Sequence, residues 1–136
     1  MTKRISPKWI DKLDENEIFV FGSNLAGMHG GGAAAVAMKW GAIWGQGVGL
    51  QGQTYAIPTM QGGVETIKPY VDEFFAFAKS NANLKFLVTE IGCGIAGFTV
   101  EEIAPLFKQA IDKNIANVYL PKSFYEMLVK DEGVKE

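Results

Sequence analysis

The segment "EIFVFGSNLAGMHGGGAAAVAMKWG" (residues 17–41) decides the fold, because it passes from an apolar run to a glycine-rich loop and then to an alanine-rich stretch. The continuous apolar run over residues 17–22 predicts a strand that is covered on both faces of its sheet. The alanine-rich stretch predicts a helix that ends at Gly41, since glycine readily adopts the left-handed conformation found after helices. Strand, loop and helix in this order indicate an α/β unit.

The same alternation continues through the rest of the chain. Apolar runs predict further strands over residues 54–59, 85–90 and 117–121. Helical spacing or capping pairs predict helices over residues 67–80, 99–114 and 123–130, and residues 41–53 are expected to form a loop with short extended pieces.

Proline and capping residues predict local details of these helices. Pro69 is expected in the first turn of its helix, and Pro105 is expected to distort the early turns of the next one. Thr99 with Glu102, and Ser123 with Glu126, have the spacing of capping boxes.

The order of elements predicts right-handed crossovers and a three-layer α/β/α sandwich around a central mixed or parallel sheet. A single domain over residues 1–136 is expected, with a core at about residues 17–130 and a polar, frayed C-terminal tail over residues 131–136.

Composition excludes several classes of function. The 136 residues are 48% hydrophobic and 21% charged, which is typical of a globular domain. The net charge is −2 and the basic residues are scattered, so no duplex nucleic-acid partner is expected. One cysteine excludes an intramolecular disulfide, and with one histidine no metal site is expected. No apolar run is long enough for a membrane span or an export segment, so the predicted location is the cytoplasm.

Two glycine loops are the candidate ligand site. The first contains Gly30, Gly31 and Gly32, and the second, "IGCGIAGFT" (residues 91–99), follows the third predicted strand. Glycines permit close approach of the backbone to an anionic ligand. The dinucleotide fingerprint G-x-G-x-x-G and the Gly-Lys-Ser/Thr ending of a P-loop are both absent, which argues against nicotinamide-dependent redox chemistry and against nucleoside triphosphate hydrolysis.

With "SNLAGMHGGGAAAVAMKWGA" (residues 23–42) and "IGCGIAGFTVEEIAPLF" (residues 91–107), the chain resembles the macrodomain superfamily, whose members bind ADP-ribose. It is most similar to the short macrodomain-like proteins of phages and prophages, which would place a phage-encoded protein in the host cytoplasm. The "IGCG" tetrapeptide resembles the branch that removes terminal ADP-ribose from carboxylate side chains. The resemblance implies a small-molecule ligand and no cofactor, and the oligomeric state stays open.

The resemblance also implies roles for individual residues. Asn24 would bond the hydroxyls of the distal ribose, and the amides of residues 94–97 would receive the diphosphate. Phe98 would form a wall for the sugar or the base, or would belong to the core. The full implied ligand-binding set is Gly22, Ser23, Asn24, Gly30, Gly31, Gly32, Gly92, Cys93, Gly94, Ile95, Ala96, Gly97 and Phe98.

Three departures from the family pattern bear on function. Ala34 and Ala96 stand where hydrolases of the family carry aspartates, and the family's leading strand, with an aspartate that reads adenine, has no clear counterpart before residue 17. Binding of ADP-ribose or a related nucleotide–ribose phosphate is therefore the main prediction. The alternatives are an ADP-ribosyl hydrolase acting on protein or nucleic acid, and a phage-associated interaction protein with a vestigial pocket.

Three residues have two interpretations each. His29 is a general base or a solvated loop residue, and Cys93 is a nucleophile or a small packed residue. Glu90 is an acid or base, or else an exposed carboxylate or salt-bridge partner. In the hydrolase alternative, Asn24, His29 and Glu90 are the candidate catalytic residues.

Overall fold

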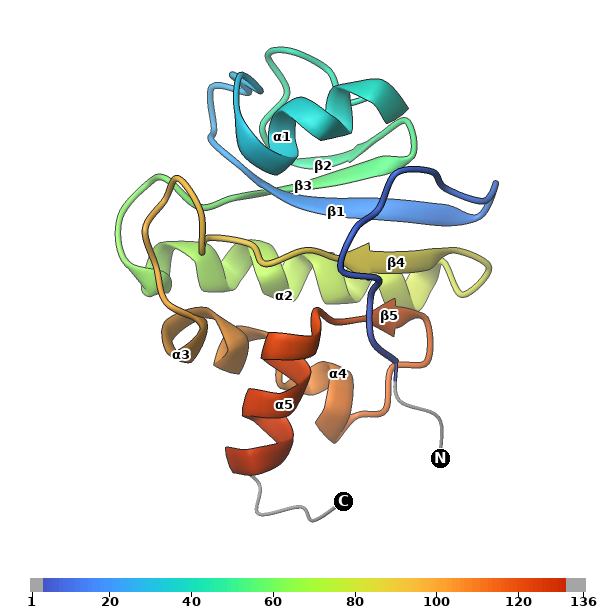
Figure 1. Cartoon of the computed structure of the whole chain (residues 1–136), viewed down its shortest axis with the longest axis vertical. Helices are drawn as coiled ribbons and strands as arrows, with labels where there is room; N and C mark the ends of the chain where they lie inside the picture. The colour runs from blue at the N-terminus through green and yellow to red at the C-terminus, as the bar shows by residue number, and fades with distance from the viewer. Residues whose placement is uncertain (1–3, 132–136) are drawn as a thin grey trace.

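The computed structural model describes residues 4–131 and shows one mixed sheet with the strand order β2-β3-β1-β4-β5 (Figure 1). Strands β1, β3, β4 and β5 are parallel, and β2 is antiparallel to β3. The predicted α/β class with a mixed sheet is confirmed. The strands of the described part of the chain are β1 (Glu17–Ser23), β2 (Gly49–Gln51), β3 (Thr54–Pro58), β4 (Lys85–Val88) and β5 (Val118–Tyr119).

Helices cover both faces of this sheet. Figure 1 shows α1 on one side of the sheet and α2 on the other. Alternate residues of β1 divide between two cores: Phe19 and Phe21 pack with residues of α1, whereas Ile18 and Val20 pack with residues of the other helices. Burial on both faces explains why β1 is apolar throughout rather than at every second residue. The helices are α1 (Gly32–Ala37), α2 (Val64–Ser80), α3 (Val100–Ile103), α4 (Gln109–Asp112) and α5 (Lys122–Asp131), with 3-10 turns η1 (Met38–Trp40) and η2 (Ala104–Phe107).

The predicted helix ends are confirmed in two places. Gly41 follows η1 with φ 104°, the left-handed conformation expected of it. Thr99 and Glu102 form the capping box, in which each backbone amide donates to the other's side chain at 3.2 and 2.9 Å. Pro105 distorts the following turns as expected, since α3 gives way to η2 at Ala104.

Two other expectations about the helices are wrong. Helix α2 begins at Val64, before the predicted start, so Pro69 lies in its second turn; the amide and hydroxyl of Thr66 both donate to the Gly63 carbonyl and close an earlier first turn. Ser123 lies inside α5 and does not cap it, because its hydroxyl donates to the carboxylate of Glu90.

The N-terminal residues pair with the far edge of the sheet, which the sequence did not predict. Ile5 forms a parallel bridge with Leu120, supported by bonds from Ser6 N to Leu120 O (2.8 Å) and from Leu120 N to Arg4 O (3.1 Å). An extended segment therefore precedes β1, although it is shorter than a strand. Apart from Asp131, which ends α5, the predicted frayed tail over residues 131–136 lies outside the described residues.

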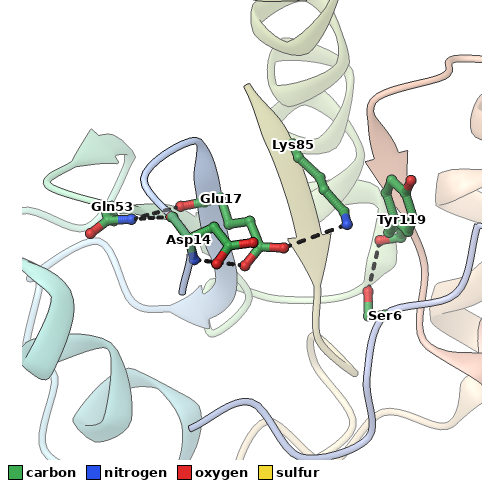
Figure 2. Close-up of polar contacts among 6 residues, drawn as sticks. All are labelled: Ser6, Asp14, Glu17, Gln53, Lys85 and Tyr119. Carbon is green, nitrogen blue, oxygen red and sulfur yellow. Dashed lines mark hydrogen bonds and ion pairs between the residues drawn. The ribbon is translucent and has the colours of Figure 1, made fainter. Parts of the chain in front are cut away.

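Polar contacts join the amino-terminal ends of the strands (Figure 2). Glu17 at the start of β1 pairs with Lys85 at the start of β4 at 3.5 Å, and accepts a bond from the Asp14 amide at 2.9 Å. The Gln53 amide donates to the carbonyls of Asp14 and Glu17, at 2.8 and 3.2 Å. These contacts hold the strands together at their amino-terminal ends, which lie opposite the glycine loops. No helix within the described residues has both the length and the apolar character needed to cross a membrane.

Candidate functional site

The two glycine loops follow β1 and β4, which are neighbouring parallel strands. From β1 the chain crosses to β3 on one side, whereas β4 lies on the other side, so β1 and β4 form a switch point of the sheet. Ligands of open α/β sheets bind outside the carboxyl ends of the strands at such a point. The loops start close together, since a Cβ added to Gly22 would lie 3.4 Å from the amide nitrogen of Gly92.

A cavity of about 160 Å³ lies between the loops. It brings together ten of the fifteen candidate catalytic and ligand-binding residues, whereas Gly30, His29, Cys93, Gly97 and Phe98 do not line it. Phe98 instead packs against the larger core. The ten are Gly22, Ser23, Asn24, Gly31, Gly32, Glu90, Gly92, Gly94, Ile95 and Ala96.

In the described part of the chain, the second loop presents three consecutive backbone amides without hydrogen-bond partners. Gly97 N donates to Gly94 O at 3.0 Å and Phe98 N donates to Gly92 O at 2.8 Å, and these two bonds close the turn. Within the described residues, the amides of Gly94, Ile95 and Ala96 have no hydrogen-bond partner, and all three residues line the cavity. Unpaired amides grouped in a turn form a concavity suited to an anion.

Asn24 shapes the first loop through its side chain. Its Nδ2 donates to the carbonyl of Met28 at 3.1 Å, and its Oδ1 accepts from the amide of Met28 at 2.9 Å. The side-chain amide thus closes residues 24–28 into a turn, a common role of asparagine. One Nδ2 hydrogen and one lone pair of Oδ1 stay available beside the cavity.

Residues 41–49 support the first loop through three hydrogen bonds. The Ser23 hydroxyl donates to Gly47 O at 2.5 Å, Gly45 N donates to Gly27 O at 2.8 Å, and His29 Nε2 donates to Gln46 O at 3.0 Å.

His29 is 2% exposed and its ring packs edge-on against Phe21. Its interpretation as a solvated loop residue is wrong, because the supporting segment covers it. His29 lines neither of the cavities described here.

Cys93 is held as a neutral thiol. Burial raises the pKa of Cys93 to about 11, and the nearby carboxylates of Glu90, Glu102 and Glu101 act in the same direction. The thiol donates to the carbonyl of Ile91 at 3.6 Å and packs against the larger core. A nucleophilic cysteine needs the opposite shift, so these contacts favour the packed-residue interpretation.

We expect Cys93 to react slowly with iodoacetamide at pH 8, at least about tenfold more slowly than the same cysteine in the urea-unfolded chain. The raised pKa leaves little thiolate at that pH, and the rate should keep rising until the pH approaches 11. Because the chain has one cysteine, mass spectrometry of the alkylated protein measures the rate without interference. Equal rates for the folded and unfolded chains would contradict the assignment.

Glu90 follows the end of β4 and lines the cavity between the loops. Its side chain is exposed, and its Oε2 accepts a hydrogen bond from the Ser123 hydroxyl at 2.5 Å. Glu90 thus links the second loop to α5.

A larger cavity of about 670 Å³ adjoins the first and shares Ala33, Thr89 and Glu90 with it. It is lined by residues 5–10, by Val36 of α1 and by the start of α5. These residues were not predicted from the sequence, because the N-terminal segment is short and mixes polar and apolar residues without a periodic pattern. The one available signal was that Pro121 and Lys122 follow β5 at the same edge of the sheet as the glycine loops.

Charge in the smaller cavity is sparse. Among its lining residues in the described chain, Glu90 is the one ionisable side chain, and no lysine or arginine is present. No group of three or more histidine, cysteine, aspartate or glutamate side chains that could hold a metal ion occurs within residues 4–131. An anion in this cavity would therefore be held by peptide amides.

Comparisons with known proteins found no match: no family model, curated protein or solved structure is similar to this chain at a significant level.

Proposed function

We propose that this protein binds ADP-ribose, or a related nucleotide–ribose phosphate, across the two cavities, in a macrodomain-like α/β/α fold. One observation carries the proposal: both glycine loops line a single cavity at the switch point between β1 and β4, where three unpaired amides are available. This is the arrangement in which α/β proteins hold phosphate groups.

The two cavities suit the two ends of such a ligand. The amides of residues 94–96 receive the diphosphate, and the terminal ribose lies beside Asn24 in the smaller cavity. The nucleoside occupies the larger cavity, whose 670 Å³ is in the range of small-molecule sites.

Binding is favoured over hydrolysis by the side chains at the two positions where the family's hydrolases carry aspartates. Ala34 and Ala96 both line the smaller cavity, and each contributes a methyl group instead of a carboxylate. The buried His29 and the neutral Cys93 supply no base or nucleophile there.

The hydrolase alternative keeps Asn24 and Glu90 as candidate catalytic residues, since both line the smaller cavity. Incubation with proteins mono-ADP-ribosylated on carboxylates, and with ADP-ribosylated nucleic acid, tests it; release of ADP-ribose that is lost in Glu90→Gln would establish the hydrolase.

The vestigial-pocket alternative predicts a cleft filled by side chains. The cavity of about 160 Å³ between the loops favours binding over this alternative, although the Ile95 side chain of the second loop approaches Gly31 of the first loop.

Calorimetric titration with ADP-ribose should give one binding site whose affinity changes less than about threefold between roughly 0.05 and 0.5 M NaCl. Amide dipoles bind the anion, and no lysine or arginine among residues 4–131 lines the smaller cavity, so screening by salt removes little attraction. Absence of heat at millimolar ligand would contradict the proposed function. A steep loss of affinity with salt would contradict the assignment of the diphosphate to the amides of residues 94–96.

A further inference from the structure

Among residues 4–131, three line both cavities: Ala33, Thr89 and Glu90. Any ligand that extends from one cavity into the other passes these residues. Ala33 offers only a methyl group, and the Thr89 hydroxyl is already bonded to the carbonyl of Val20 at 2.7 Å. The Thr89 hydroxyl keeps only its neutral acceptor capacity, so Glu90 provides the charged hydrogen-bond acceptor at this junction.

The Glu90 carboxylate is oriented but not neutralised. The Ser123 hydroxyl bonds Oε2, whereas Oε1 has no hydrogen-bond partner in the described part of the chain. The nearby Lys122 is instead 4.0 Å from Glu126, its partner one helical turn away in α5. The junction thus presents a negatively charged acceptor whose direction is set by α5.

We propose that Glu90 determines which ligands this protein accepts, by binding a free ribose diol at the junction and rejecting a phosphate there. This inference rests on the proposed function. With the diphosphate on residues 94–96 and the nucleoside in the larger cavity, the ribose at the junction is the one attached to the base. A free carboxylate oxygen accepts hydrogen bonds from vicinal hydroxyls, and the same charge repels a phosphate. The ligand class is a nucleoside diphosphate sugar whose base-linked ribose carries an unmodified 2′,3′-diol.

Two ligands that differ by one phosphate test this assignment: ADP-ribose and ADP-ribose 2′-phosphate. The wild-type protein should bind ADP-ribose at least about tenfold more tightly than the 2′-phosphate. Glu90→Gln keeps the size of the side chain and an oxygen that can accept from Ser123, but removes the charge. In this variant the ratio of the two affinities should fall by at least about tenfold, chiefly because the 2′-phosphate binds better.

Glu101→Gln is the matched control. Glu101 is an exposed carboxylate of α3, lies near the second loop and lines neither cavity. The Glu101→Gln substitution changes the net charge by the same amount as Glu90→Gln. The ratio of the affinities for the two ligands should nevertheless stay at its wild-type value.

The outcomes separate this inference from the proposed function. If the wild-type protein binds neither ligand, the proposed function fails. If it binds ADP-ribose but the ratio is the same in Glu90→Gln as in the wild type, or falls equally in Glu101→Gln, then Glu90 does not select the ligand and this inference is overturned.

Discussion

Gly31→Val is expected to lower the affinity for ADP-ribose by at least about a hundredfold while the protein stays folded. Gly31 lines the smaller cavity, and a Cβ added to it would lie 3.1 Å from Cδ1 of Ile95 on the opposite loop. A valine side chain would therefore occupy the space assigned to the ligand. Gly31 has φ −151°, which a valine adopts without strain, and the Ile95 side chain is 74% exposed and free to move aside. The loss of stability should be about 1 kcal/mol, because valine is a poor residue at the start of a helix.

Gly30→Val is the matched control for this experiment. Gly30 is the preceding residue, lines neither cavity, and would bring its Cβ no closer than 4.0 Å to the Trp44 ring. Calorimetry should find its affinity within about threefold of the wild type. If both variants bind equally well, the cavity between the loops is not the ligand site.

Gly47→Ala is expected to destabilise the protein by about 3 kcal/mol, which corresponds to a melting temperature roughly 10 °C lower. A Cβ at this position would lie 2.1 Å from the backbone oxygen of Asn24 and 2.8 Å from Cα of Leu25. Both contacts are with backbone, so the supporting segment has to move away from the first loop. That movement breaks the bond from Ser23 to Gly47 and the bond from His29 to Gln46, and leaves buried polar groups without partners.

Gly94→Ala distinguishes this clash from a general cost of replacing glycine. Gly94 has no atoms within 4 Å of an added Cβ and does not have a positive φ. Its melting temperature, measured by circular dichroism, should stay within about 2 °C of the wild type. If the Gly47→Ala and Gly94→Ala proteins have the same melting temperature, the segment over residues 41–49 does not support the first loop.

Much of the fold could be predicted from patterns confined to a few neighbouring residues. The apolar run at the start of β1, the capping box of Thr99 and the glycine at position 41 each produce the predicted local structure. These predictions succeed because each signal and its consequence lie within one or two turns of chain. Pro69 shows the limit, since the start of α2 was set by the bonds from Thr66 to Gly63 and not by the proline.

The candidate site could be predicted only in part. The sequence indicated two glycine loops, and the structure places both at one cavity, but not every residue of each loop faces it. His29 lies in the same loop as Gly30, Gly31 and Gly32, and the sequence nearby does not distinguish it from an exposed loop residue. The structure shows that the segment over residues 41–49 buries it. Ser123 had the spacing of a helix cap, but it bonds Glu90, which lies 33 positions earlier.

The sequence by itself determined the order of β1, β3, β4 and β5, the helical segments between them and the two turns rich in small residues, because backbone propensity and hydrophobic periodicity act over short stretches of chain. The tertiary structure alone decided that β4 lies beside β1, that the N-terminal residues pair with β5, and that Glu90 stands where the two cavities meet. Those features depend on which strands pair and which faces pack, and the free energy of such pairing comes from contacts between residues far apart in the chain.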